Sequence, residues 1–138
     1  MLRDDSKRSR LLKRIEFIRF EGQEILSVDF TGCSAAEVEA IARLVPDYVS
    51  QKPRNSVLIL TNFADASFND DALRTMKETA VFDKPYVKKS ALIGTESLPR
   101  HFYDDLTNFS RRTLPVFRDR EKALLWLVGK GNELHTVV

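Results

Sequence analysis

The sequence predicts one α/β domain, built on a mixed sheet of about five strands with four helices. Two observations lead to this prediction. From residue 34 onward, segments with a helical apolar period alternate with short apolar runs, which is typical of parallel strands joined by right-handed crossovers. Before them, two extended segments flank a short turn and predict a β-hairpin. A chain of 138 residues has the size of a single domain.

The N-terminal hairpin is expected over residues 13–31. In residues 13–20 the apolar positions do not alternate strictly. This pattern is typical of a strand with a bulge or of a strand that carries apolar side chains on both faces. Glu21-Gly22-Gln23 is a turn sequence. In residues 24–31 apolar and polar side chains alternate, which predicts a strand with one buried face. The apolar positions of that strand are Leu26, Val28 and Phe30.

The first helix is expected after Ser34, because Glu37 follows three residues later and completes a capping-box pattern. Pro46 lies inside the helical pattern and predicts either a kink or an end and restart of the helix. Residues 57–60 are a continuous apolar run, which predicts a central strand buried on both faces. The apolar residues on one face of this first helix are Val38, Ile41, Val45 and Tyr48.

A second helix is expected over residues 71–81 and a further strand over 87–94, with Pro85 preventing continuation of the helix. Ser97 is the expected cap of a third helix. The buried stripe of that helix is expected to comprise Leu98, Phe102, Leu106 and Phe109.

The C-terminal part predicts an edge strand followed by a last helix. Pro115 lies within the short apolar segment 114–117, and proline confines a strand to the edge of a sheet. Asp119 is the expected cap of the last helix, and Gly129 its end. The inward positions of this helix are Ala123, Leu124, Trp126 and Leu127.

The charge of the chain is concentrated at its start. The first 14 residues carry six basic and two acidic side chains, whereas the remainder carries 16 basic and 18 acidic ones. The folded part therefore has no global basic field, and no nucleic-acid partner is expected. We divide the chain into a basic tail (1–12), the domain (13–129) and a C-terminal tail (130–138).

The apolar runs are too short for a transmembrane helix, which needs about 20 apolar residues. The start of the chain has basic residues without an apolar segment behind them, so a secretory leader is not expected either. These two observations predict a cytoplasmic protein.

The sequence offers no assembled catalytic set. His101 and His135 lack a second histidine or a cysteine at ligand spacing, and Cys33 is the only thiol. A lowered thiol pKa at Cys33 is physically possible beside a helix start, but a small buried residue at a turn is the favoured interpretation. Five scattered glycines form neither phosphate-binding motif. No catalytic residue, metal or cofactor is therefore predicted.

The polar loop after the central strand is the favoured functional segment. In open parallel sheets, ligands and partners sit outside the carboxyl ends of the strands. This loop lies there and leads into a helix N-terminus, where its last residues also serve as helix caps. The predicted partner-binding residues are Asn62, Asp65, Ser67, Asn69, Asp70 and Asp71.

A calcium loop is rejected for the same segment. Asp65, Ser67 and Asn69 match the first three alternate ligand positions. Asp70 then replaces the glycine that allows the sharp turn, and Met76 stands where the bidentate glutamate is required.

Two other function classes remain open. One is a carrier or sensor of a small apolar or anionic, lipid-like ligand. The other is a hydrolase that uses Asp65 or Asp70 as a base, although the sequence shows no partner for such a base. The ligand pocket of the first alternative would be lined by Phe63, Phe68, Tyr86, Lys88 and Arg112.

Three segments carry a family resemblance: NSVLILTNF at 55–63, DKPYVKKSALIG at 83–94 and FRDREKALLWL at 117–127. They resemble the bacterial SpoIIAA-like proteins, which are placed with the STAS domains and are similar in shape to the CRAL-TRIO lipid-binding domain. The likeness extends over about residues 13–128. It implies a small βα superhelix that acts as a non-catalytic interaction module. The leading hypothesis is a domain that acts by binding protein, with a homodimer as one form of this binding.

The resemblance also implies where a partner switch would lie. In phosphorylated anti-sigma-factor antagonists, a serine within Asp-Ser-x-Gly opens the helix after the central strand. This chain has Asn69-Asp70-Asp71-Ala72 there, without the hydroxyl or the glycine, and Ser67 is the nearest hydroxyl. A fixed carboxylate can imitate part of the charge of a phosphate.

Overall fold

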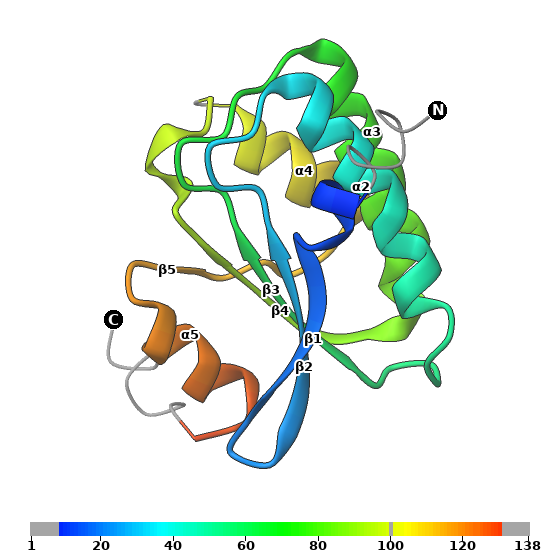
Figure 1. The fold of residues 1–138 in the computed structure, drawn as a ribbon, viewed down its shortest axis with the longest axis vertical. Helices are drawn as coiled ribbons and strands as arrows, with labels where there is room; N and C mark the ends of the chain where they lie inside the picture. Colours follow the sequence, from blue (N-terminus) through cyan, green and yellow to red (C-terminus); the bar gives the residue numbers. More distant parts are fainter. Residues whose placement is uncertain (1–8, 100, 131–138) are drawn as a thin grey trace.

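In the computed structural model, which describes residues 9–99 and 101–130, the chain forms a five-stranded mixed sheet with helices on both faces (Figure 1). The strands follow one another across the sheet in chain order, β1-β2-β3-β4-β5. The predicted α/β class, the hairpin and the mixed sheet are confirmed.

The hairpin consists of β1 (Ile15–Phe20) and β2 (Gln23–Asp29), paired antiparallel. Its turn uses left-handed backbone at Glu21 (φ 51°) and Gly22 (φ 77°), as tight two-residue hairpin turns require. β1 forms one edge of the sheet, and β2 connects the hairpin to the parallel strands.

The remaining strands are parallel to β2. They are β3 (Val57–Asn62), β4 (Val87–Ile93) and the two-residue β5 (Val116–Phe117). β5 lies at the second edge, as Pro115 predicts; this proline directly precedes the strand, and its carbonyl accepts from the Leu92 N–H of β4 (2.9 Å). β3 is the centre of the sheet, and its first five residues are buried.

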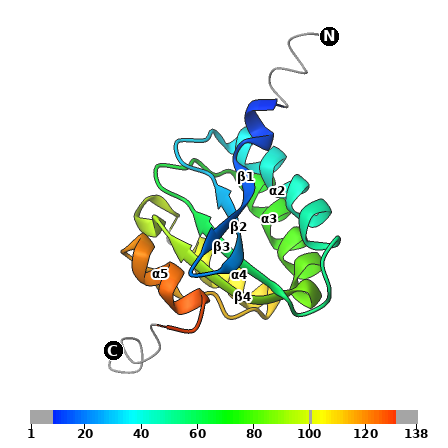
Figure 2. The same ribbon diagram turned by 60° about the horizontal axis from the view of Figure 1, so that its bottom comes forward.

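The helices divide unequally between the two faces of the sheet (Figure 2). One face carries α2 (Ala35–Val49), α3 (Asp70–Asp83) and α4 (Phe102–Ser110), and the other carries α5 (Arg120–Leu127). Alternate residues of β3 therefore enter different cores. Ile59 belongs to the larger core under α2, α3 and α4, whereas Leu58 and Leu60 belong to the smaller core under α5.

The cap of α2 forms as the sequence predicts. The Ser34 hydroxyl accepts from the Glu37 N–H (3.2 Å), and the Glu37 carboxylate accepts from the Ser34 N–H (2.9 Å). Pro46 does not end this helix: α2 continues to Val49, so the expected end and restart is wrong. Val45 and Val49, on either side of Pro46, are both buried, and their packing compensates for the backbone hydrogen bond that proline cannot make.

The third helix begins later than predicted. Ser97 is not its cap: residues Thr95–Ser97 form a 3₁₀ turn, and α4 starts at Phe102. Leu98 is extended (ψ 145°) because the following Pro99 disfavours helical backbone. With this start, the buried positions of α4 are Phe102, Leu106 and Ser110, and Phe109 is 55% exposed instead of buried.

Both termini of the described chain pack on the domain. Residues 9–12, assigned above to the tail, form a helical turn whose Leu11 packs against the larger core. At the other end, the Asp119 carboxylate caps α5 by accepting from the Glu121 N–H (2.8 Å), as predicted. The expected C-terminal tail lies outside the described residues from 131 onward.

The end of β4 lies unusually close to the loop after β3. Gly94 has left-handed backbone (φ 68°). A Cβ atom at this position would stand 2.5 Å from both the Ala64 nitrogen and the Asn62 Oδ1. These two atoms hydrogen-bond each other (3.0 Å), so the absence of a side chain at Gly94 allows the turn at Asn62 to form.

We expect Gly94→Ala to lower the free energy of unfolding by about 2–4 kcal/mol, because it combines left-handed strain with a backbone clash. Gly22→Ala is the matched control: its φ is also positive, but no atom lies within 4 Å of the added Cβ. The control should lose only about 1–2 kcal/mol. Urea denaturation measures both, and equal losses would contradict the close approach.

Candidate functional site

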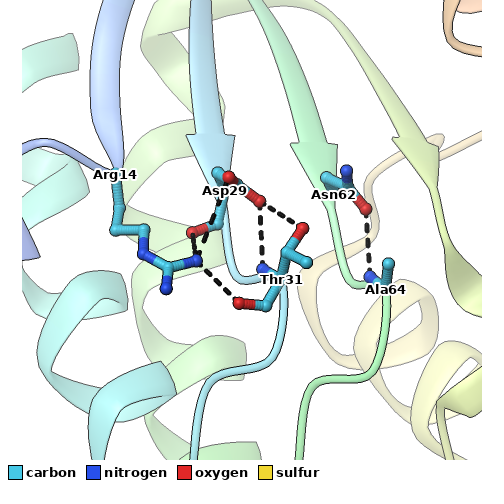
Figure 3. Close-up of polar contacts among 5 residues, drawn as sticks. All are labelled: Arg14, Asp29, Thr31, Asn62 and Ala64. Carbon is cyan, nitrogen blue, oxygen red and sulfur yellow. Dashed lines mark hydrogen bonds and ion pairs between the residues drawn. The ribbon is translucent and has the colours of Figure 1, made fainter.

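The loop from Asn62 to Asp71 is held by its own backbone. The Asn62 side chain accepts from the Ala64 N–H (Figure 3), and the Ala66 N–H donates to the Phe63 carbonyl (3.0 Å). The Ser67 N–H donates to the Cys33 carbonyl (2.9 Å), which ties the loop to the segment after β2. The side chains that it presents are therefore arranged before any partner binds.

Aromatic packing anchors this loop from below. Phe63 stacks on Phe30 with centroids 5.3 Å apart, and it meets Phe102 edge-on at 5.6 Å. Phe68 packs against Phe102 at 4.4 Å. Phe30, Phe63 and Phe102 are fully buried, so the start of α4 and the loop share one core.

Five of the six predicted partner-binding residues lie on one segment of the surface. Asp65, Ser67, Asn69, Asp70 and Asp71 are all exposed. Asn69 also caps α3 by accepting from the Ala72 N–H (2.8 Å), and Asp71 pairs with Arg74 (3.2 Å). The sixth residue is separate from them, because Asn62 faces a polar hollow on the α5 side of the sheet.

Beside the loop lies a surface hollow of about 170 Å³ that local sequence patterns do not predict. Its lining combines aromatic and aliphatic side chains with two acidic residues, Asp70 and Asp105. It forms because the start of α4 packs against the start of α3, more than thirty positions earlier in the chain. The lining residues are Phe68, Asn69, Asp70, Leu73, Pro99, His101, Phe102 and Asp105.

The polar hollow on the other face has a volume of about 180 Å³ and mixed charges. Arg14 donates to the Thr31 carbonyl (2.7 Å) and lies 3.9 Å from the Asp29 carboxylate (Figure 3). Asp29 in turn accepts from the Thr31 N–H (3.0 Å). These contacts fasten the start of β1 to the end of β2. The lining residues are Lys13, Arg14, Glu16, Ser27, Asp29, Leu60, Asn62 and Arg120.

The structure does not bring the five residues of the alternative ligand site together. Phe63 and Arg112 line one internal cavity beneath the sheet. Phe68 belongs instead to the surface hollow, Tyr86 packs on Phe82 (6.1 Å), and Lys88 is exposed on β4. The pockets described in this structure therefore do not combine these five side chains.

The internal cavity has a volume of about 50 Å³ and contains two charged side chains, Asp83 at the end of α3 and Arg112 after α4. Asp83 is only 4% exposed. Burial raises the pKa of its carboxyl from 3.8 to about 7, although the positive charge of Arg112 acts in the opposite direction. Burial likewise lowers the pKa of Arg112.

Cys33 is a buried structural residue, as the favoured interpretation states. It is 1% exposed, and burial raises the pKa of its thiol, opposite to the shift that would make it reactive. Across residues 9–99 and 101–130, no three His, Cys, Asp or Glu side chains gather closely enough to hold a metal ion. His135 lies outside this part of the chain.

No helix within the described residues combines the length and the apolar composition that a membrane span requires. Comparisons with known protein families, with curated proteins and with solved structures found no significant match.

We expect the stability difference between Asp83→Asn and the native protein to depend on pH. Because the carboxyl of Asp83 keeps a proton up to about pH 7 in the folded protein, its favourable contribution is lost as the pH rises from about 4 through 7. The asparagine variant lacks this titration. As the pH rises from about 4 to 7, the free energy of unfolding of the variant should therefore increase relative to that of the native protein by up to about 3 kcal/mol.

Chemical denaturation at pH 4, 5.5, 7 and 8 measures this difference. Asp47→Asn is the control, since Asp47 lies exposed on α2. A difference for Asp83→Asn that stays constant from pH 4 to 8 would contradict the raised pKa.

Proposed function

We propose that the protein is a non-catalytic, STAS-like cytoplasmic module that binds another protein through its acidic face. We define the acidic face as the surface hollow and the exposed loop residues beside it, Asp65, Ser67, Asn69, Asp70 and Asp71. The observation that carries the proposal is the hollow itself, which is lined by Asp70 and Asp105 together with apolar side chains.

The chemistry of the acidic face defines the kind of partner. Phe68, Leu73 and Pro99 offer apolar surface to one inserted side chain. Asp70 and Asp105 attract cations beside it, and Asp71 and Asp104 add negative charge at the same two helix starts. A peptide segment with one large apolar residue flanked by lysine or arginine satisfies both requirements.

The rigidity of the loop also favours binding. Its backbone hydrogen bonds and the aromatic packing beneath it are already formed, so little conformational entropy is lost when a partner docks. Asp70 and Asp71 are acidic residues encoded in the first turn of α3. The negative charge at this helix start therefore does not require phosphorylation. Ser67 is exposed beside them and is the hydroxyl nearest to this charge.

A homodimer that joins two acidic faces is disfavoured by charge. In a two-fold dimer the same patch meets itself, so Asp70 and Asp105 of one copy would face the carboxylates of the other. Like charges that meet across an interface cost several kcal/mol. The proposed partner is therefore a basic segment of another protein.

The two other function classes have less support. A lipid-like ligand needs a pocket of about 300 Å³ or more, and the internal cavity that contains Phe63 and Arg112 measures about 50 Å³. A hydrolase with Asp65 or Asp70 as its base needs a hydrogen-bonded partner for that carboxylate. Both side chains lie at the exposed surface, where water competes for such a contact.

We expect synthetic peptides with one phenylalanine or leucine between lysines to bind in the micromolar range and to bind more weakly as salt increases. The double variant Asp70→Lys, Asp105→Lys should lose at least tenfold in affinity, because it reverses the acidic charge of the hollow and leaves its apolar side chains unchanged. Fluorescence anisotropy with labelled peptides measures both effects.

The matched control is Glu78→Lys, a charge reversal at an exposed position of α3 away from the hollow. This variant should bind the basic peptides with native affinity. Peptides with glutamate in place of lysine should bind neither the native protein nor this variant. Equal affinity of the double variant and the native protein for the basic peptides would refute the acidic face as the binding surface.

A further inference from the structure

β1 forms one edge of the sheet, and within the described residues it pairs only with β2. The strand runs for six residues without a proline, a glycine or a shift of register. An edge strand without such interruptions presents backbone groups on which another strand can pair. Phe17, Ile18 and Phe20 are half-buried, so both faces of this edge keep apolar surface in contact with water. The hairpin extends below α2 in Figure 1.

The hydrogen bonds of the hairpin decide which backbone groups of β1 point outward. The Asp29 N–H donates to the Arg14 carbonyl (2.8 Å), at the end of the β1–β2 register. In an antiparallel pair, positions that bond to the partner strand alternate with positions that do not. Ile18, four residues after Arg14, therefore bonds to β2. The N–H and C=O groups of Phe17 and Arg19 point away from the sheet.

We propose that β1 pairs antiparallel with β1 of a second copy of this chain, so that the two sheets join across a two-fold axis. The axis passes beside Ile18, and Phe17 of each copy lies opposite Arg19 of the other. This register pairs the outward groups of both residues and forms about four intermolecular hydrogen bonds. The Ile18 side chains of the two copies meet on the face that carries α5.

The side chains of β1 complement each other in this register. Arg19 shares the α2 face of the strand with Phe17, so its guanidinium comes opposite the Phe17 ring of the second copy, where cation–π contact is favourable. Within one copy this guanidinium donates to the exposed Gly22 carbonyl (2.9 Å), which uses one of its five N–H donors. Lys52 also lies over the Phe17 ring, and its charge is balanced by Glu24 at 2.9 Å.

The two ends of β1 carry opposite charges. Lys13 is exposed just before the strand. Glu21 follows the strand in the turn, and its ion pair with Lys130 leaves its side chain 45% exposed. A two-fold antiparallel pair places the start of each strand beside the end of the other, so unlike charges meet at both ends. This self-complementarity selects a second copy as the partner. The acidic face belongs to other segments, so the inference is independent of the proposed function.

Sedimentation velocity of the full chain tests the association. Two short edge strands make a small interface, so a dissociation constant of roughly 10–100 µM is expected. The mass should therefore shift from one copy toward two between protein concentrations of about 5 and 500 µM. The double variant Asp70→Lys, Asp105→Lys should associate as the native protein does, which separates this interface from the acidic face. A monomer at every concentration would overturn the proposal.

Amide hydrogen exchange identifies the surface without any substitution. In the dilute protein the N–H groups of Phe17 and Arg19 should exchange rapidly, whereas the Ile18 N–H is protected by its bond to β2. In the concentrated protein the exchange of Phe17 and Arg19 should slow at least threefold, and that of Ile18 should not change. A dimer in which Phe17 and Arg19 exchange equally fast at both concentrations uses another surface and contradicts the proposal.

A proline variant tests the backbone contact. Arg19→Pro removes an outward N–H from each copy and keeps the β1–β2 hydrogen bonds, because an edge strand tolerates proline on its open side. It should weaken association at least tenfold, and Arg19→Ala, which keeps the N–H, should weaken it less. Arg118→Ala, at an exposed position after β5, is the control and should have no effect. Native association of Arg19→Pro would overturn the proposal, and the exchange measurement decides should this variant not fold.

Discussion

The burial of β3 on both faces is the constraint on which the rest of the structure depends. Its alternate residues enter two separate cores, so helices must cover both sides of the sheet. The same alternation sends Thr61 toward the internal cavity and Asn62 toward the polar hollow. A shift of the register by one residue would exchange these environments, because side chains in a strand point to opposite faces in turn.

α3 connects the acidic face with the buried carboxyl group of Asp83. Its first turn carries Asp70 of the acidic face, and its last residue is Asp83 in the cavity. Carboxylates at the start of a helix are stabilised by the helix dipole and by water. At the other end the dipole is unfavourable for a negative charge, and water is excluded. The negative charge of an aspartate is therefore favourable at the start of α3 and unfavourable at its end.

The predicted partner-binding loop and the predicted ligand site differ in how far the sequence could define them. The loop is one continuous segment, and its cap at Asn69 is visible from local spacing alone. The ligand site required contacts between distant segments, and only Phe63 and Arg112 came together. Asp83 was overlooked because an acidic residue near Pro85 looks like a solvated helix end, and only tertiary packing buries it.

The sequence by itself determined the order of strands and helices, the caps of α2 and α5, and the edge position of β5, because these features follow from apolar period and from residues a few positions apart. Tertiary structure decided the rest. The arrangement of the strands across the sheet, the outward position of Phe109 and the surface hollow depend on contacts between distant segments. So does the environment of Asp83, because burial and electrostatic neighbours arise from segments that only folding brings together.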